Sequence, residues 1–143
     1  MIYGFYSSRI IKFKGVQLQM SSIPDIRLHE GELNIMELLW SNKALAAKDI
    51  SKIIKEYIGW EKNTTYTVIK RLIEKGAVKR EDPGFVCRAT ISKRTVQSIE
   101  TKVLLNKLYN GSLSTFLTEF LKNQDLSKTE LLELQRIVGE QRF

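Results

Sequence analysis

Apolar positions recur at three- and four-residue intervals between residues 26 and 75, which is the spacing that gathers side chains on one face of a helix. This pattern predicts helices at Ile26–Trp40, about Ala46–Tyr57 and about Lys62–Lys75, with Gly59 and Gly76 ending the second and third. The inward faces consist of Leu33, Met36, Leu39 and Trp40 in the first, Ile50, Ile53, Ile54 and Tyr57 in the second, and Thr65, Val68, Ile69, Leu72 and Ile73 in the third.

After Gly76 the period of the pattern shortens. The runs Ala77–Glu81 and Phe85–Ile91 have strand character, and Asp82-Pro83-Gly84 between them is a turn signal, so together they predict a hairpin. Three helices followed by a basic hairpin predict a winged helix-turn-helix. In that arrangement the third helix enters the major groove of DNA and the hairpin, or wing, lies along the backbone.

Local capping signals divide the rest of the chain into three more helices. Ser92 is a suitable N-cap for a fourth helix to about Tyr109, and Asn110-Gly111 is a suitable left-handed stop. A fifth helix is expected from Ser112 to about Asn123. The residues from Ser127 to Glu130 form a capping box, which predicts a sixth helix from Lys128 nearly to the end.

These last helices carry more large apolar side chains than short helices can hide among themselves. Large exposed apolar patches usually mark interfaces, so we expect a homodimer. The alternative is a monomer in which these helices fold back on the winged domain. A two-fold protein suits two DNA half-sites about one helical turn apart or a multiple of that. The candidate dimerisation residues are Leu104, Leu105, Leu108, Leu113, Phe116, Leu117, Phe120, Leu121, Leu131, Leu134, Ile137 and Val138.

The polar side of the third helix is the candidate DNA-reading face. Threonine, asparagine and tyrosine can bond to base edges or phosphates, and arginine matches the two acceptors of guanine. An ordinary solvated helix face is the competing interpretation. The candidate DNA-binding residues of this helix are Asn63, Thr64, Tyr66, Thr67, Lys70 and Arg71.

Charge favours the DNA interpretation because it is concentrated around the third helix and the hairpin. Of the formal net charge of +7, Lys62 to Arg94 alone holds +6, from nine basic residues against Glu74, Glu81 and Asp82. A local excess of this kind implies a polyanionic partner. Arg80 and Arg88, near the hairpin, are expected to contact phosphates. A membrane surface is disfavoured because this segment lacks a strongly basic amphipathic helix with aromatic anchors.

The composition bounds the class of protein. A chain of 143 residues with 43% hydrophobic content can bury one ordinary core, or one small domain plus an extension. No apolar run is long enough to span a membrane and no signal peptide is evident, so we expect a cytoplasmic protein without membrane insertion. The expected organisation is a disordered or loosely attached extension at 1–22, a winged domain at 23–92 and a three-helix dimerisation domain at 93–143. A speculative alternative is that Met20 is the natural start.

Catalysis and metal binding find little support. The chain has one histidine and scattered acids without catalytic spacing, so no enzyme and no cofactor are expected. The single cysteine, Cys87, has no neighbour with which to form a disulfide or hold a metal. A winged-helix module that contacts protein or RNA, without sequence-specific DNA binding, is the main rival function.

From Ile23 to the end, the sequence resembles the penicillinase-repressor family of bacterial transcriptional regulators, the BlaI/MecI/CopY group. The resemblance rests on IPDIRLHEGELNIMELLW, KDISKII, WEKNTTYTVIKRLIEKGAV and LYNGSLSTFLTEFLKNQDLSKTELLELQRI. It implies a dimeric winged-helix repressor of resistance or stress genes that binds an inverted-repeat, double-stranded DNA operator. By the same resemblance, Asn63, Thr64, Thr67, Lys70 and Arg71 occupy the positions of the recognition helix.

Three departures from the family pattern limit what the resemblance implies. His29 stands where a serine N-cap is usual. No cysteine follows Cys87, whereas copper-sensing members carry a C-terminal cysteine cluster. In β-lactam-responsive members a sensor protease, a membrane-bound partner by resemblance, cuts before a phenylalanine in the fifth helix. The matching pair here is Glu119-Phe120, with glutamate in place of the usual asparagine.

Overall fold

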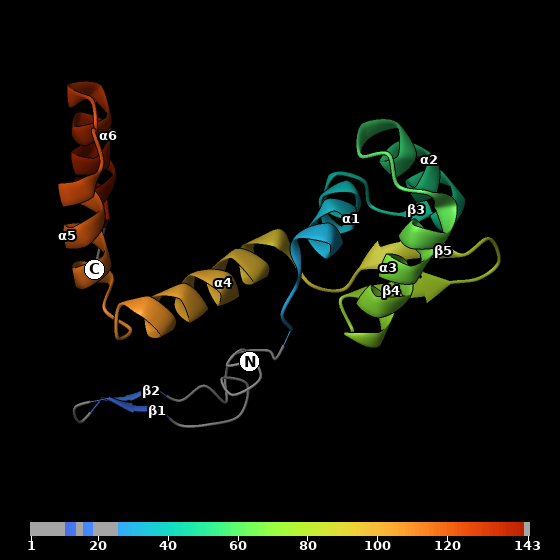
Figure 1. The fold of residues 1–143 in the computed structure, drawn as a ribbon, viewed down its shortest axis with the longest axis horizontal. Helices are drawn as coiled ribbons and strands as arrows, with labels where there is room; N and C mark the ends of the chain where they lie inside the picture. The colour runs from blue at the N-terminus through green and yellow to red at the C-terminus, as the bar shows by residue number, and fades with distance from the viewer. Residues whose placement is uncertain (1–10, 14–15, 19–25, 142–143) are drawn as a thin grey trace. The chain divides into compact units, whose positions relative to one another are not determined.

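The computed structural model describes residues 11–13, 16–18 and 26–141. By internal contacts the chain forms two compact units, Met1–Thr101 and Lys102–Phe143. Figure 1 colours the chain from blue at the N-terminus to red at the C-terminus. Most of the predicted N-terminal extension lies outside the described residues. Its described part is a short antiparallel pair, β1 (Ile11–Phe13) and β2 (Val16–Leu18).

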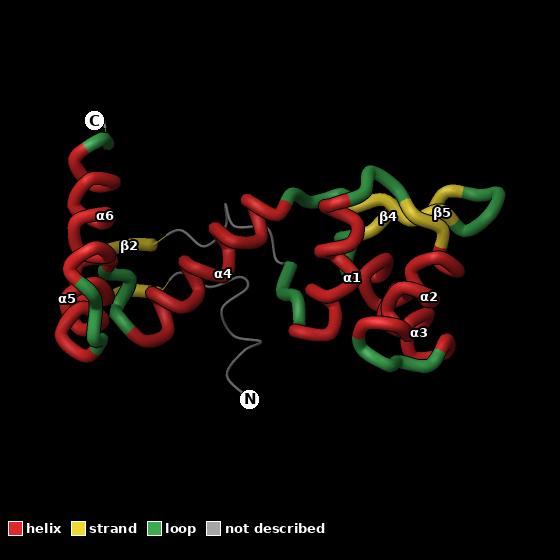
Figure 2. Tube along the Cα trace, turned by 90° about the horizontal axis from the view of Figure 1, so that it is seen from above, coloured by secondary structure: helices red, strands yellow, loops and turns green. Residues whose placement is uncertain are grey.

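The first unit contains a winged helix-turn-helix, which confirms the predicted architecture. Its helices are α1 (Glu30–Ser41), α2 (Ala47–Tyr57) and α3 (Lys62–Glu74), and α3 packs against α1, α2 and the first wing strand. The wing consists of β4 (Val78–Glu81) and β5 (Val86–Ala89), joined by a tight turn (Figure 2).

A third strand, absent from the sequence prediction, completes the sheet. β3 (Leu45–Ala46) pairs antiparallel with β5, so the strand order is β3-β5-β4. The pairing is short and joins segments about forty residues apart. Two residues show no alternation of their own, so only the tertiary contact reveals the strand.

The core of this unit is continuous from α1 to the start of α4 (Lys93–Leu108). Its largest fully buried side chains lie on the predicted inward faces, with Ile35 and Cys87 added. Trp60 packs beside Gly31, where an added Cβ would lie 3.1 Å from the indole ring. The core residues are Leu28, Ile35, Met36, Leu39, Ala47, Ile50, Ile54, Val68, Ile69, Leu72, Ala77, Val78, Cys87 and Val96.

Two helix ends differ from the prediction. The first helix starts at Glu30 rather than Ile26, because the Glu32 carboxylate accepts a hydrogen bond from the His29 backbone N–H at 2.9 Å and fixes the start there. Tyr57 was expected on the inward face of the second helix but is 79% exposed. It is the last residue of α2, and the chain turns away at Gly59, where φ is +86°.

The boundary between the two compact units lies inside α4, after Thr101. Val96 and Ile99 are buried, so the first half of α4 belongs to the core of the first unit. Two ion pairs hold the same half of α4 to α1 and the residues just before it: Arg27 contacts Glu100 at 3.1 Å, and Lys93 contacts Glu37 at 2.9 Å.

The second unit contains the end of α4, α5 (Leu113–Asn123) and α6 (Lys128–Gly139). The predicted caps are present: Ser92, Ser112 and Ser127 each accept a hydrogen bond from the backbone N–H three residues on. Asn110 and Gly111 both have positive φ and form the predicted left-handed stop. The helices are thus defined by local signals, although no residue of α5 or α6, both described in full, is buried.

Candidate nucleic-acid interface

The third helix is divided into two faces by its packing. Thr65, Val68, Ile69 and Leu72 are buried, so the helix is fixed along one side by the core. The opposite side is exposed. It consists of Asn63, Thr64, Thr67, Lys70 and Arg71, all of them candidates from the sequence.

The exposed side chains of α3 differ in whether they form hydrogen bonds or ion pairs within the protein. The Thr67 hydroxyl donates to the Asn63 carbonyl at 2.9 Å, which leaves its oxygen lone pairs and its methyl group for an external partner. The side chains of Lys70 and Arg71 make no hydrogen bond or ion pair with any described residue. Their charges are therefore available to a ligand.

Tyr66 does not belong to the water-facing set in which the sequence placed it. Its side chain is half-buried and packs against the core, with its ring edge-on to Phe85 at a centroid distance of 5.7 Å. The helical pattern of α3 alone could not reveal this, because Phe85 comes from the wing.

Two basic residues of the wing lie opposite each other on neighbouring strands. The register places Lys79 directly opposite Arg88 on the outer face, where both are exposed. Like charges directly opposite each other on a sheet are destabilising. Glu81 offsets part of this through an ion pair with Arg88 at 2.9 Å. An anion bound along this face would relieve the remaining repulsion, and Lys79 is therefore a candidate that the sequence prediction did not single out.

Arg80 lies at the tip of the wing over an aromatic ring. Its guanidinium carbon is 3.8 Å from the centroid of Phe85, and its Nε donates to the Asp82 carboxylate at 3.0 Å. Arg80 is 45% exposed in its side chain, so it is held in place yet still accessible.

Not all the basic residues of this region are available to a polyanion. Lys75 donates to Glu32 at 2.7 Å and to the Arg27 carbonyl at 2.8 Å, so its charge serves the fold. Lys93 pairs with Glu37. The basic residues between 62 and 94 without an ion pair to a described residue are Lys62, Lys70, Arg71, Lys79 and Arg94.

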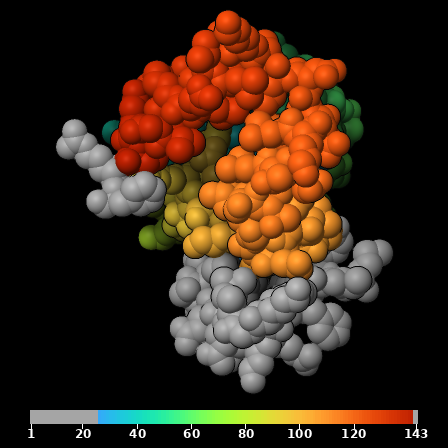
Figure 3. All heavy atoms as spheres, turned by 90° about the vertical axis from the view of Figure 1, so that its left-hand side faces the viewer, coloured from blue at the N-terminus to red at the C-terminus, as the bar shows by residue number. Residues whose placement is uncertain are grey.

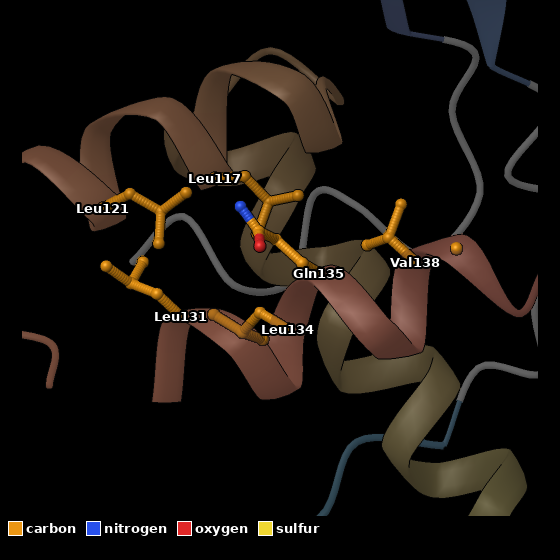
Figure 4. A pocket seen from close by; sticks show the side chains of 7 residues that line it. Leu117, Leu121, Leu131, Leu134, Gln135 and Val138 are labelled. Carbon is orange, nitrogen blue, oxygen red and sulfur yellow. The ribbon is translucent and has the colours of Figure 1, made fainter. Parts of the chain in front are cut away.

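A second candidate surface is an apolar groove between α5 and α6. It encloses about 460 Å³ and is lined by Leu117, Leu121, Leu131, Leu134, Gln135, Val138 and Gly139. Figure 4 shows leucines of α5 directed toward side chains of α6 across this groove. In the space-filling view both helices, drawn orange to red, lie on the face toward the viewer (Figure 3).

The predicted dimerisation residues are mostly accessible in the single chain. Leu105 and Phe116 are half-buried, and Phe116 packs edge-on to Tyr109 at 5.1 Å. The others are exposed: Leu104, Leu108, Leu113, Leu117, Phe120, Leu121, Leu131, Leu134, Ile137 and Val138. Glu119 and Phe120, the candidate cleavage pair, are both exposed within α5.

Within residues 26–141 and the two short strands before them, no group of three or more histidine, cysteine, aspartate or glutamate side chains could hold a metal ion. None of the helices in the described part of the chain has the length and apolar character that a membrane crossing requires.

The sequence matches a known protein family. A family model described as penicillinase repressor matches residues 28–140. The chain belongs to the penicillinase repressor family. Membership confirms the resemblance inferred from the motifs, and it makes the chain a transcriptional repressor rather than an enzyme.

Two sequence relatives align with most of the chain, and one solved structure aligns with about half of it. The penicillinase repressor of Bacillus licheniformis is 31% identical over 123 residues, spanning 85% of this chain and 94% of the relative. The methicillin resistance regulatory protein MecI of Mammaliicoccus sciuri is 26% identical over 115 residues, spanning 79% and 94%. The solution structure of the DNA binding domain of the repressor BlaI is 26% identical and covers 52% of this chain and 90% of that one, with a TM-score of 0.46.

Proposed function

We propose that this family member represses transcription by binding an inverted-repeat DNA operator as a homodimer. The controlled gene is a resistance or stress-response gene, and a sensor-dependent signal such as proteolysis relieves repression. The observation that carries the proposal is the two-sided packing of α3. One side is fixed in the core, while the other presents Thr67, Lys70 and Arg71 to solvent.

The chemistry of this exposed side suits a major groove. The Arg71 guanidinium, free of ion pairs to described residues, has the forked donors that match the O6 and N7 acceptors of guanine. The Thr67 methyl group and hydroxyl oxygen suit a thymine methyl and a base amino group. Asn63 and Thr64 lie in the first turn, where recognition helices contact bases.

The wing supplies the contacts that position the helix without reading sequence. Lys79 and Arg88 form a like-charge pair on the outer face of the wing, and a phosphate between them would lower their mutual repulsion. Arg80, at the tip, has the accessibility for a further phosphate contact.

Dimerisation is assigned to α5 and α6. Their exposed leucines border a groove of about 460 Å³, and a second copy offers the same apolar side chains in return, as a two-fold interface requires. A dimer of this kind holds two recognition helices, which is why the operator is expected to be an inverted repeat.

DNA binding by fluorescence anisotropy tests the proposal. Wild-type protein is titrated into a labelled duplex from its own promoter region and into a random duplex of the same length, at several salt concentrations. We expect a preference of roughly 10³-fold or more for the promoter and a steep loss of affinity as salt rises. A module that contacts protein or RNA would lack that preference, and such a result would reject the repressor assignment.

Two substitutions separate base reading from phosphate binding. Arg71→Ala is expected to weaken promoter binding by ~1–3 kcal/mol while barely changing binding to random DNA. Arg88→Ala is expected to weaken both and to flatten the salt dependence. Lys128→Ala, an exposed lysine on α6, is the matched control and is expected to change neither. Equal losses on the two duplexes with Arg71→Ala would contradict its base-reading role.

Release by proteolysis is assigned to the Glu119–Phe120 bond. This bond lies within α5 near the apolar groove, and a cut there would separate α6 and the end of α5 from the rest of the chain. Mass spectrometry of the protein from induced cells tests the assignment: fragments ending at Glu119 and beginning at Phe120 are expected. An intact chain in fully induced cells would mean that repression is relieved by another route.

A further inference from the structure

Two cations and two aromatic rings form a continuous row from the start of the recognition helix to the tip of the wing. Lys62 Nζ lies 5.6 Å from the centroid of the Tyr66 ring. Tyr66 is edge-on to Phe85 at 5.7 Å, with an interplanar angle of 79°. Arg80 then covers the far ring, 3.8 Å from the Phe85 centroid. We call these four side chains the cation-aromatic ladder.

The backbone at Phe85, in the middle of the ladder, has an unusual conformation. Phe85 has φ of +49°, in the left-handed region that bulky residues rarely adopt. Its carbonyl accepts a hydrogen bond from the Ala47 N–H at 2.9 Å, which ties the wing to the start of α2. Such a conformation persists only where its surroundings enforce it, and residues of this kind cluster at functional sites.

Arg80 is arranged for a further ligand. Its guanidinium face is stacked on Phe85 and its Nε is bonded to Asp82, while its two terminal nitrogens make no hydrogen bond to any described residue. A stacked guanidinium keeps its outer donors in one plane and loses little freedom when it binds a planar or tetrahedral anion. Lys62, at the opposite end, is exposed at the start of α3.

We propose that Tyr66 and Phe85 are positioning residues that set the wing against the recognition helix and hold Lys62 and Arg80 for two backbone phosphates. Tyr66 then acts through its ring and reads no base. This proposal rests on the DNA-binding function proposed above and deepens it. It also assigns Lys62 a role in binding the partner.

The salt dependence of binding tests the ladder, because loss of stability alone does not change the number of phosphates neutralised. Phe85→Leu is expected to reduce the slope of log affinity against log salt by ~0.9, the value for one phosphate. At about 0.15 M salt this corresponds to an affinity loss of about fivefold. Arg80→Gln is expected to give the same change, and the double variant no further change in slope.

Conservative variants separate the ring from the hydroxyl. Phe85→Tyr and Tyr66→Phe keep both rings, and each is expected to bind within about twofold of wild type. Tyr66→Leu is expected to reduce the slope as Phe85→Leu does. Tyr57→Leu, at an exposed tyrosine on α2, is the matched control and should leave binding unchanged. An unchanged slope in Phe85→Leu, or equal damage from Tyr66→Phe and Tyr66→Leu, would overturn the proposal.

The ladder can also be tested without DNA. In the free protein, the ring current of Phe85 should move the Arg80 side-chain proton resonances upfield, and Phe85→Leu should abolish that shift while Tyr66→Phe keeps it. The shift together with no DNA binding by wild type would reject the phosphate-holding role and the repressor function, but not the geometry. DNA binding by wild type without the shift would reject the ladder alone.

Discussion

The winged unit and the C-terminal helices contain the same kinds of apolar residue but use them differently. In the winged unit Ile35, Ile50 and Leu72 are completely buried. In the C-terminal unit Leu132 is 57% exposed and Val138 67% exposed. Apolar periodicity therefore predicts which face of a helix is apolar and favours burial. It does not predict whether the same chain covers that face.

The polar contacts follow the same division. Some ion pairs of the winged unit join distant segments, such as Lys75 to Glu32 and Arg27 to Glu100. In the C-terminal unit Arg136 pairs with glutamates three and four residues away on its own helix. Local hydrogen bonds in this unit also affect a carboxyl group: those from the Ser127 backbone and side chain lower the pKa of Glu130 below its ordinary value. The C-terminal helices are thus defined one by one, whereas the winged unit is held together as a whole.

The same truncation in both units should therefore have unequal effects. Leu72→Ala removes a fully buried side chain and leaves a cavity, so we expect a loss of ~2–5 kcal/mol in the free energy of unfolding. Leu132→Ala, at an exposed position on α6, should change it by less than about 0.5 kcal/mol. Urea unfolding followed by circular dichroism measures both. Similar losses would mean that α6 is buried to a degree the single chain does not reveal.

A charge placed in the groove should act on assembly rather than on the fold. Leu121→Asp puts a carboxylate where a second copy is proposed to pack, and we expect the dimer dissociation constant to rise by ~30-fold or more, about 2 kcal/mol. Sedimentation equilibrium measures this constant. Thr118→Asp, at an exposed position on the same helix, is the control for added charge. A wild-type protein that is monomeric at every concentration would remove the dimer from the proposal.

The Lys75–Glu32 pair should contribute to stability because it satisfies a buried carboxylate. The Glu32 side chain is 4% exposed, and its Oε1 has no hydrogen-bond partner among the described residues, so Lys75 is its main compensation. Lys75→Met should lower the free energy of unfolding by ~1–3 kcal/mol. The double variant with Glu32→Gln should recover part of that loss. If Lys75→Met unfolds like the wild type, the pair contributes nothing.

The sequence predicted best what local chemistry decides. Helix ends at Ser112, Ser127 and Gly111 follow from caps and left-handed stops that need only neighbouring residues. The exposure of Lys70 and Arg71 follows in the same way, since helical spacing opposes them to the buried face.

Several features that the sequence missed depend on contacts between distant segments. The pairing of Leu45–Ala46 with β5 leaves no periodic signal. The burial of Tyr66 depends on Phe85 of the wing, and the use of Lys75 depends on a carboxylate 43 residues away. A charge count could not distinguish Lys75, which serves the fold just after α3, from Lys70 within α3, because both are basic and near each other in the sequence.

The reactivity of cysteine thiols is the smallest expected effect, but it reports directly on the difference in burial between the two units. Burial raises the pKa of Cys87 to about 11 from an ordinary value of 9.0, and the nearby Arg80 lowers it only in part. At pH 8 the thiolate fraction is then roughly 100-fold lower than for an ordinary thiol, so Cys87 should resist alkylation in the native protein. Because the native pKa lies above the ordinary value, this thiol's contribution to stability is fully present below pH 9. It is lost as the pH rises through about 11.

The C-terminal unit lacks a cysteine, so Leu132→Cys supplies its counterpart. This thiol, at an exposed position on α6, should react with iodoacetamide at pH 8 at nearly the rate of a free thiol, while Cys87 in the same molecule reacts only after urea unfolds the winged unit. Peptide mass mapping after timed alkylation distinguishes the two sites. Protection at position 132 that disappears on dilution would indicate that a second copy covers α6, and protection that persists in the monomer would indicate that the chain covers it itself. Rapid labelling of Cys87 without denaturant would instead show that the sheet opens locally around β5. The two units would then differ in exposed surface but not in local stability.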